Sequence, residues 1–240
     1  MQDVDILRQL SDEKNAAVKG GLYHQTQIKL SFNSNRIEGS RLSEEQTRYI
    51  FETNTVGVTD GETANVDDII ETVNHFACFD YLLVNAEKPL SECIIKEFHR
   101  LLKQGTRQSR LSWFNVGEYK SRPNMVGNAE TTPPNRVAEK MSVLLGEYNA
   151  LEKPTVADII TFHVRFENIH PFQDGNGRVG RLIMFKECLK YGICPFIIGH
   201  EHKLYYYRGL KEYNHEQGVL TDTCLPAQDE YAKLVRYFME

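Results

Sequence analysis

The chain has 240 residues, of which 41% are hydrophobic and 25% are charged, so it is long enough to bury the core of one well-packed domain. Its net charge of −5 weighs against non-specific nucleic-acid binding, its apolar runs are too short to cross a bilayer, and its polar N-terminus lacks signal-peptide features. Five cysteines without a C-x-x-C pair predict neither a disulfide framework nor a zinc ribbon. We therefore expect a cytoplasmic protein that binds neither nucleic acid nor membrane.

Helical patterning dominates the chain. The segment 6–32 has no sustained heptad, yet it is a candidate for a self-association helix and hence for a homodimer. Further along, polar N-caps, apolar residues at helical spacing and terminal glycines predict a series of helices. Their expected ranges are 65–87, 89–105, 133–151, 154–169, 176–192, 202–218 and 226–239.

Residues 112–134 interrupt the helical pattern. Gly, Pro and Asn cluster there around two short extended pieces, "FNVGEYK" (114–120) and "NMVG" (124–127). This composition predicts a β-hairpin or flap laid over helices, while the segment 53–65 has the composition of a loose loop. We therefore expect one all-α domain with a small β-hairpin flap.

The segment "HPFQDGNGRVGR" (170–181) contains the parts of a phosphate-binding site. A helix beginning near Asn176 would present the free backbone N–H groups of its first turn, and those of the flanking glycines, at the positive end of its dipole. Arg178 and Arg181 lie three residues apart, so their guanidinium groups project from one face and can hold a di- or triphosphate. Unpaired arginines around a glycine loop have no use in packing, which favours a binding role.

Three other residues of this segment have complementary chemistry. Asp174 precedes the glycine loop and offers the hard oxygen ligand that Mg²⁺ on a nucleotide prefers. His170, with a pKa near neutrality, can take a proton from an attacking hydroxyl group. Phe172 is expected to point into the core and fix the loop. Together these parts predict metal-assisted transfer to or from a nucleotide phosphate.

The same segment resembles the signature of the Fic family, H-P-F-x-[D/E]-G-N-G-R-x-x-R, at every specified position. Fic proteins are mostly helical and usually transfer AMP from Mg·ATP to a hydroxyl side chain of a protein, with a flap over the active site. The resemblance implies that His170 is the general base, that Asp174 holds Mg²⁺ or Mn²⁺, and that Arg181 binds the γ-phosphate. It assigns the α- and β-phosphates to Gly175, Asn176, Gly177 and Arg178.

The likeness extends over roughly residues 92–227, which we expect to be the catalytic core. An N-terminal helical region, 1–91, would precede this core, and a C-terminal helix, 228–240, would follow it. Within the core, "EFHRLL" (97–102) resembles the family's helix behind the active site. The segment "NMVGNA" (124–129) is similar to the flap, which holds a target peptide by backbone pairing.

Further nucleotide contacts are implied by the same resemblance. In the flap they are Val126, Gly127 and Asn128. The segment "YYYRGLKEYN" (205–214) resembles the family's adenosine-pocket helix, where the contacts would be Tyr206, Tyr207 and Asn214. From helical spacing alone, the two tyrosines are equally well interpreted as core aromatics.

A second segment, "SNRIEG" (34–39), is similar to the family's inhibitory pattern [S/T]-x-x-x-E-[G/N]. Ser34 and Glu38 are four residues apart and share one face of a helix, while Gly39 is a natural helix terminator. The resemblance implies that Glu38 lies at the helix end and pairs with Arg181 at the γ-phosphate position, so that ATP binds poorly. Because this helix belongs to the same chain, no separate antitoxin subunit would be needed.

Several alternatives stay open. The same residues could remove AMP from a modified protein, with Glu38 orienting a water molecule. An inactive nucleotide-sensing module is disfavoured by the intact His170 and Asp174, and a variant with different transfer chemistry is disfavoured by the intact Gly-Asn-Gly-Arg. Two pairs of possible metal ligands, His163 with His170 and Glu71 with His75, supply too few ligands for a transition-metal site. The expected partners are ATP, an unknown protein target, and the protein itself as a substrate of self-modification.

Overall fold

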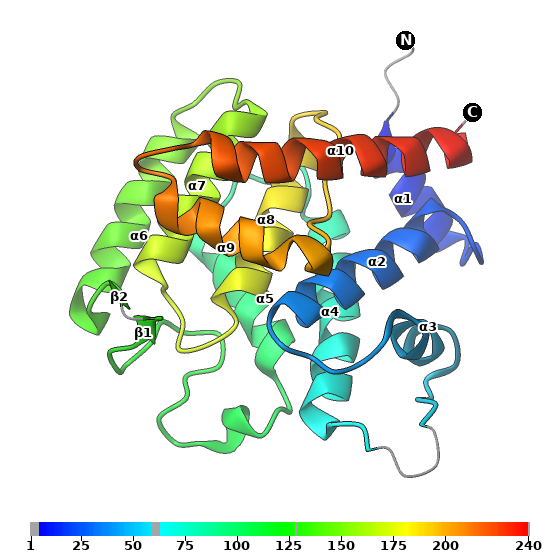
Figure 1. The fold of residues 1–240 in the computed structure, drawn as a ribbon, viewed down its shortest axis with the longest axis horizontal. Coiled ribbons are helices and arrows are strands. Elements are labelled where there is room, and N and C mark those ends of the chain that lie inside the picture. Colours follow the sequence, from blue (N-terminus) through cyan, green and yellow to red (C-terminus); the bar gives the residue numbers. More distant parts are fainter. Residues whose placement is uncertain (1–4, 59–62, 128, 240) are drawn as a thin grey trace.

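The computed structural model describes residues 5–58, 63–127 and 129–239, and these residues form α-helices joined by loops and by one small hairpin (Figure 1). In chain order the helices are α1 (Ile6–Asn15), α2 (Leu22–Ile37), α3 (Glu44–Thr53), α4 (Val66–Val84), α5 (Glu92–Lys103), α6 (Pro134–Asn149), α7 (Val156–Ile169), α8 (Asn176–Lys190), α9 (Lys203–Glu212) and α10 (Gly218–Met239). Short 3₁₀ turns, η1 and η2, cover Gln108–Arg110 and His200–His202. The predicted all-α class with a small β-hairpin is confirmed.

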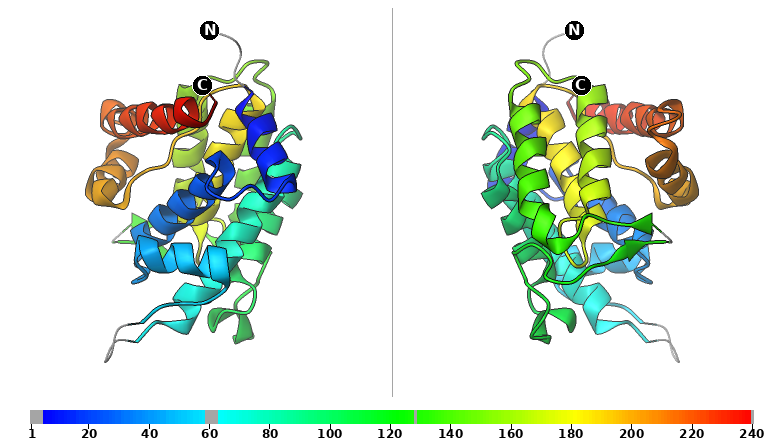
Figure 2. Two further views of the ribbon diagram at one scale, coloured as in Figure 1. Left: turned by 90° about the vertical axis from the view of Figure 1, so that its right-hand side faces the viewer. Right: turned by 90° about the vertical axis from the view of Figure 1, so that its left-hand side faces the viewer.

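Helix α8 forms the centre of the molecule. Every residue in the range 176–189 except Gly177 is buried, and α2, α4, α5 and α7 pack around it. A helix that is buried over nearly its whole circumference belongs inside a core, and Figure 2 shows the yellow helix enclosed in this way. Lys186 is a buried lysine of α8, and its ammonium group pairs with the neighbouring Glu187 at 2.7 Å.

One hydrophobic core joins the N-terminal helices to the rest of the protein. Leu10 of α1, Ile37 of α2 and Phe79 of α4 belong to the same cluster as Phe166 of α7 and Val179 of α8. Helix α2 therefore lies directly against α8. This packing brings the C-terminal end of α2 close to the first turn of α8.

The helix boundaries follow the caps in the sequence. Asn65, Ser91 and Thr155 each accept a hydrogen bond from a first-turn backbone amide, of α4, α5 and α7 respectively. Beyond the far ends of α5 and α8, Gly105 and Gly192 have φ values of +74° and +66°, a left-handed conformation that favours glycine. The expected positions of these helices are therefore confirmed to within a few residues.

Two helices differ from expectation. Helix α3 was not predicted, although Ser43 and Gln46 form a reciprocal capping box at its start, a signal that the sequence carries. The C-terminal helix begins at Gly218, not near residue 226, and it contains Pro226 in its interior. Its first turns are fixed by packing on α9, where a Cβ at Gly209 would lie 2.7 Å from the Cα of Leu220.

The division placed between residues 227 and 228 therefore falls inside α10. The segment 6–32 yields α1 and most of α2 as two separate helices. Part of the loop expected at 53–65, residues 59–62, lies outside the described residues. None of the helices in the described ranges combines the length and apolar character that a membrane crossing requires.

The hairpin consists of β1 (Met125–Val126) and β2 (Ala129–Glu130), which pair antiparallel with Val126 opposite Ala129. It projects from the helical body (Figure 2). The extended strand expected at 114–120 was wrong, because this segment forms turns. Its last residue, Lys120, bonds through its backbone N–H to the carbonyl of Pro171 at 2.9 Å, so it pairs with the loop before α8 and not with a second strand of the hairpin.

Candidate active site

The loop between α7 and α8 carries the segment that the sequence singles out. His170 ends α7 with φ +51° and Gly175 begins α8 with φ +82°, so the chain reverses through two left-handed residues. Helix α8 begins at Asn176 as predicted, and the N–H groups of its first turn have no partner within the helix. This turn is therefore an anion-binding position of the kind that a helix N-terminus provides.

Phe172 points into the core and anchors the loop there, as predicted. Its ring is fully buried and stacks on His99 of α5 with centroids 4.1 Å apart and planes 6° from parallel. The side chain of Asn176 accepts from the backbone N–H of Phe172 at 2.8 Å and donates to its carbonyl at 2.9 Å. Because both groups of this amide are engaged, Asn176 can offer a phosphate only its backbone N–H.

His170 has a much lower pKa than the sequence led us to expect. Burial and, after it, the positive charge of Lys120 lower the pKa of the imidazole to about 4. The expectation of a pKa near neutrality was wrong because the sequence gives no sign of either effect. At pH 7 the imidazole is neutral, which is the form that accepts a proton.

Lys120 also holds the base of the hairpin. Its ammonium group is buried without a carboxylate among the described residues, and it donates to Asn124 Oδ1 at 2.7 Å and to Thr131 Oγ1 at 2.6 Å. Asn124 in turn donates to the carbonyl of Phe172 at 3.1 Å. These bonds link both ends of the hairpin to the loop that carries His170.

The hairpin presents a free edge. The side chains of Met125 and Val126 are 58% and 51% exposed. A Cβ at Gly127 would meet no heavy atom within 4 Å, and the φ of this residue is +58°. Asn128, which the resemblance also assigned to the nucleotide, lies outside the described residues.

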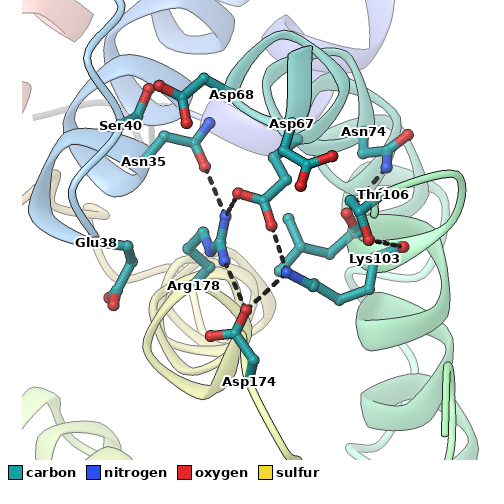
Figure 3. Close-up of polar contacts among 12 residues, drawn as sticks. Asn35, Glu38, Ser40, Asp67, Asp68, Asn74, Lys103, Thr106, Asp174 and Arg178 are labelled. Carbon is teal, nitrogen blue, oxygen red and sulfur yellow. Dashed lines mark hydrogen bonds and ion pairs between the residues drawn. The ribbon is translucent and has the colours of Figure 1, made fainter. Parts of the chain in front are cut away.

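Asp174 belongs to a cluster of four charged side chains (Figure 3). Its Oδ2 accepts from the ammonium of Lys103 at 2.7 Å and lies 3.7 Å from the guanidinium of Arg178. Glu71 of α4 completes the cluster with a short ion pair to Lys103 and a 2.5 Å contact to Arg178. Burial opposes the ionised form of Asp174, and the two cations overcome this effect, so that the pKa of Asp174 is lowered to about 2.

Both arginines of α8 are paired; this was expected for Arg181 but not for Arg178. Arg178 is 4% exposed; it bonds to Glu71 and makes a longer contact, 3.4 Å, to the side-chain oxygen of Asn35. Its carboxylate partner lies more than a hundred residues away in the chain, which is why the sequence pattern did not reveal it.

Arg181 is surrounded by the end of α2 and by α9. Its Nη2 donates to Glu38 Oε1 at 2.7 Å and to the carbonyl of Ser34 at 2.9 Å, while its Nε donates to Ser34 Oγ at 3.0 Å. Its Nη1 donates to the hydroxyl of Tyr206 at 3.3 Å. The expected contact between Glu38 and Arg181 is present, and Ser34 supports it from the preceding turn.

Glu38 lies over the first turn of α8. It is the residue that follows the last turn of α2, and Gly39, with φ +104°, ends that helix. A Cβ at Gly177 would collide with Glu38 Oε1 and lie 3.0 Å from Nη1 of Arg181. The carboxylate of Glu38 therefore occupies space beside the anion-binding turn that only a glycine leaves open.

The three residues assigned to an adenosine pocket have different environments. Tyr206 is fully buried, and its hydroxyl group bonds to His163 at 2.7 Å as well as to Arg181. Tyr207 is 39% exposed and donates to the carbonyl of Ile37 at 3.3 Å. Asn214 is exposed in the turn after α9. In this conformation Tyr206 has the position of a core aromatic.

Histidines elsewhere are packed into the core. His163 is 1% exposed beside Tyr206, and His75 is 0% exposed with its Nδ1 3.0 Å from Ser31 Oγ. In the described residues no three His, Cys, Asp or Glu side chains gather as metal ligands. A Mg²⁺ ion that arrives with a nucleotide needs only one or two carboxylates. Asp174 fits that requirement, because its side chain is 41% exposed and its second oxygen takes no part in the contacts of Figure 3.

Sequence reasoning missed three charged residues of this site, which are Glu71, Lys103 and Lys120. A signal was present for Lys103, which continues the buried face of α5 one turn after His99. A charged residue on a buried helix face predicts an opposite charge nearby. The spacing of Glu71 and His75 was considered only as metal-ligand spacing, and for Lys120 no local pattern distinguishes it from a surface residue.

Comparison with known proteins agrees with this geometry. Residues 89–188 match the model of the Fic/DOC family. The chain is 26% identical over 193 residues to the protein adenylyltransferase Fic of Nematostella vectensis, and 30% identical over 190 residues to that of Culex quinquefasciatus. These alignments cover 77% and 76% of this chain, and the chain spans only 42% and 36% of the two relatives.

Among solved structures, the chain is similar to a Fic domain containing signaling protein from Bacteroides thetaiotaomicron. The TM-score is 0.71 and the sequence identity 26%, and the alignment covers 97% of this chain and 91% of that protein. The likeness thus includes the helices before and after the family match.

Proposed function

This chain contains a Fic domain, and from that premise we propose that it is a protein adenylyltransferase, which moves AMP from ATP to a hydroxyl group of a protein side chain. One observation carries the proposal. A neutral buried imidazole, an open helix N-terminus and an aspartate with an exposed oxygen are all held on the loop of six residues between α7 and α8.

In the proposed reaction His170 takes the proton of a Ser, Thr or Tyr hydroxyl group. The oxygen attacks the α-phosphorus of ATP, a new P–O bond forms, the bond to the β-phosphate oxygen breaks, and pyrophosphate leaves. Backbone N–H groups of the range 175–177 are positioned to bind negative charge that grows on the phosphates. A Mg²⁺ ion bound to Asp174 would neutralise part of that charge.

We further propose that Glu38 inhibits this reaction. Its carboxylate holds Arg181, the arginine assigned to the γ-phosphate, at 2.7 Å and lies over the anion-binding turn. A triphosphate and this carboxylate carry the same sign of charge and would compete for one guanidinium group. Release of Glu38 from Arg181 is therefore the step that activates the enzyme.

The target of the proposed transfer is a protein segment in an extended conformation. The exposed edge at Met125 and Val126 can pair with such a segment through backbone hydrogen bonds. An edge of this kind recognises the extended backbone of a segment more than its side chains. An extended segment of the protein itself can therefore bind there, so self-modification in vitro is part of the proposal.

The test is incubation with Mg²⁺ and ATP that is labelled on either the α- or the γ-phosphate. We expect α-label on protein in the Glu38→Gly variant, much less in the wild type, and none in the double variant Glu38→Gly/His170→Ala. Incorporation of γ-label would mean that the protein transfers a phosphoryl group. Loss of AMP from pre-labelled protein on addition of the wild type would favour the removal reaction. Equal α-labelling with and without His170 would contradict the proposal.

A further inference from the structure

A buried lysine, Lys103, lies beside the cation site proposed at Asp174. Lys103 is the last residue of α5, and its side chain is 1% exposed. Its ammonium group reaches Glu71 on one side and Asp174 Oδ2 on the other. Figure 3 shows the side chains of Lys103, Arg178 and Asp174 pointing toward one another.

We propose that Lys103 is a positioning residue of the cation site, which fixes one oxygen of Asp174 and keeps the nucleotide-free protein from binding a divalent cation tightly. This inference rests on the proposed function, because it concerns the same aspartate. Its consequence is that the cation enters the site together with the triphosphate and not before it.

The charges of the cluster balance. The cluster holds two carboxylates, Glu71 and Asp174, and two cations, Lys103 and Arg178, so its net charge is zero. A divalent cation at the free oxygen of Asp174, with a bond of about 2.1 Å, would lie within a few ångströms of the ammonium of Lys103. The two charges repel each other strongly at that distance in a partly buried site. A triphosphate adds enough negative charge to offset the repulsion.

The burial of Lys103 has an energetic cost. Burial of an ammonium group is expensive unless its partners compensate it, and an apolar side chain of similar volume would pack at least as well. Leu102, the preceding residue, shows that this end of α5 accepts an apolar side chain in full burial. The charge at Lys103 therefore has a purpose other than packing.

The side chain of Lys103 lies between α4 and the loop before α8. A Cβ at Gly175 would lie 3.5 Å from Cδ of Lys103, so the lysine stem runs along the loop that leads into α8. The ammonium group is held by two acceptors from different elements, α4 and the loop. Asp174 is consequently fixed with one oxygen engaged and the other available, which is the orientation that a single-carboxylate ligand needs.

Glu71 ties this arrangement to the phosphate-binding face of α8. It bonds to Lys103 and to Arg178. Removal of its charge would leave the cluster with a net charge of +1, whereas removal of the charge of Lys103 would leave −1. The two substitutions must therefore change cation affinity in opposite directions, and a purely structural role of the cluster would not produce this sign reversal.

The experiment measures Mn²⁺ binding by electron paramagnetic resonance on nucleotide-free protein, and again with an ATP analogue whose α,β-bridge is a methylene group. The variants are Lys103→Met and Glu71→Gln. Lys96→Met is the matched control, because Lys96 is an ion-paired lysine of the same helix that bonds to Glu92 and Glu118 at 2.7 Å and not to Asp174. Circular dichroism monitors folding.

We expect Lys103→Met to bind Mn²⁺ at least about tenfold more tightly than the wild type without nucleotide, since one nearby positive charge is lost. Glu71→Gln should bind it more weakly, and Lys96→Met should match the wild type. If Lys103→Met does not fold, the Mn²⁺ affinity of Glu71→Gln without nucleotide tests the proposal. Weaker binding than the wild type supports it, and equal binding overturns it.

Two negative results have different meanings. If all proteins bind Mn²⁺ with the analogue but Lys103→Met equals the wild type without it, the role of Lys103 is overturned and the proposed function is unaffected. For the measurements with the analogue every protein also carries Glu38→Gly, because Glu38 competes with the triphosphate for Arg181. If none of these proteins binds Mn²⁺ with the analogue, the cation at Asp174 is excluded, and the proposed reaction loses its metal together with the role of Lys103.

Discussion

Oε1 of Glu38 lies 2.7 Å from Nη2 of Arg181, although 143 residues separate them in the chain. The contact exists because α2 packs directly on α8, and because Gly177 leaves room for the carboxylate beside the first turn of that helix. The arginine is 4% exposed and the carboxylate 28%, so the pair is open to solvent on the side of Glu38 only.

This geometry makes Glu38→Gly the most informative substitution. We expect it to raise the rate of protein labelling from α-labelled ATP by about ten- to a hundredfold, because loss of one competing charge is worth about 1–3 kcal/mol. Glu139→Gly is a suitable control, since Glu139 pairs with Arg136 on the exposed surface of α6. Equal rates for the wild type and Glu38→Gly would exclude an inhibitory role for this contact.

His170 and Asp174 should fail in different ways. The imidazole is placed to meet the incoming hydroxyl group, so His170→Ala should abolish transfer and leave ATP binding nearly intact. Asp174→Ala should instead weaken the dependence on Mg²⁺. Calorimetric titration with a non-transferable ATP analogue separates the two cases. A folded His170→Ala protein that no longer binds the analogue would show that His170 holds the nucleotide.

The buried histidines predict acid sensitivity of the fold. Burial lowers the pKa of His75, His99 and His163 to about 3 and that of His170 to about 4, from an ordinary value of 6.5. Between about pH 4 and pH 6.5 these histidines bind more protons in the unfolded chain than in the folded chain, so their contribution to stability is full above pH 6.5 and is lost as pH falls. Glu167, whose pKa burial raises to about 8, opposes this trend by one proton.

Near pH 5 unfolding should therefore take up about three protons, and the free energy of unfolding should fall by about 4 kcal/mol per pH unit. Urea titrations between pH 7 and pH 5 measure this slope. His75→Gln should reduce it by about one proton, whereas substitution of the exposed His215 should leave it unchanged. A free energy that is flat over this range would contradict the neutral buried state of the four histidines.

The hairpin edge makes a prediction about targets. Val126 lies opposite Ala129 in the hairpin, so Val126→Pro removes a backbone N–H that faces the partner strand. Weakening the hairpin that carries the edge should reduce protein labelling, while binding of the ATP analogue changes much less. Val126→Ala keeps the backbone donor and is the matched control. The hairpin is anchored below this point through Lys120 and Asn124, so the substitution should not disturb the loop. Unchanged labelling by a folded Val126→Pro protein would mean that targets dock elsewhere.

The sequence by itself determined the helical class, most helix boundaries and the loop that carries the chemistry. Caps such as Ser91 and Thr155 and terminators such as Gly105 act within one turn of the chain, so their effect can be read locally. The left-handed glycine at 175 and the start of α8 are local features of the same kind.

Only the tertiary structure decided what the charged groups of that loop meet. The partners of Arg178 and Asp174 come from α4 and α5, and the pKa of His170 depends on its burial and on Lys120. These contacts join segments about 50 to 110 residues apart, and interactions at such separations arise only when helices pack. The extension of α10 through Pro226 has the same origin, because the packing of its first turns on α9 outweighs the local signal of the proline.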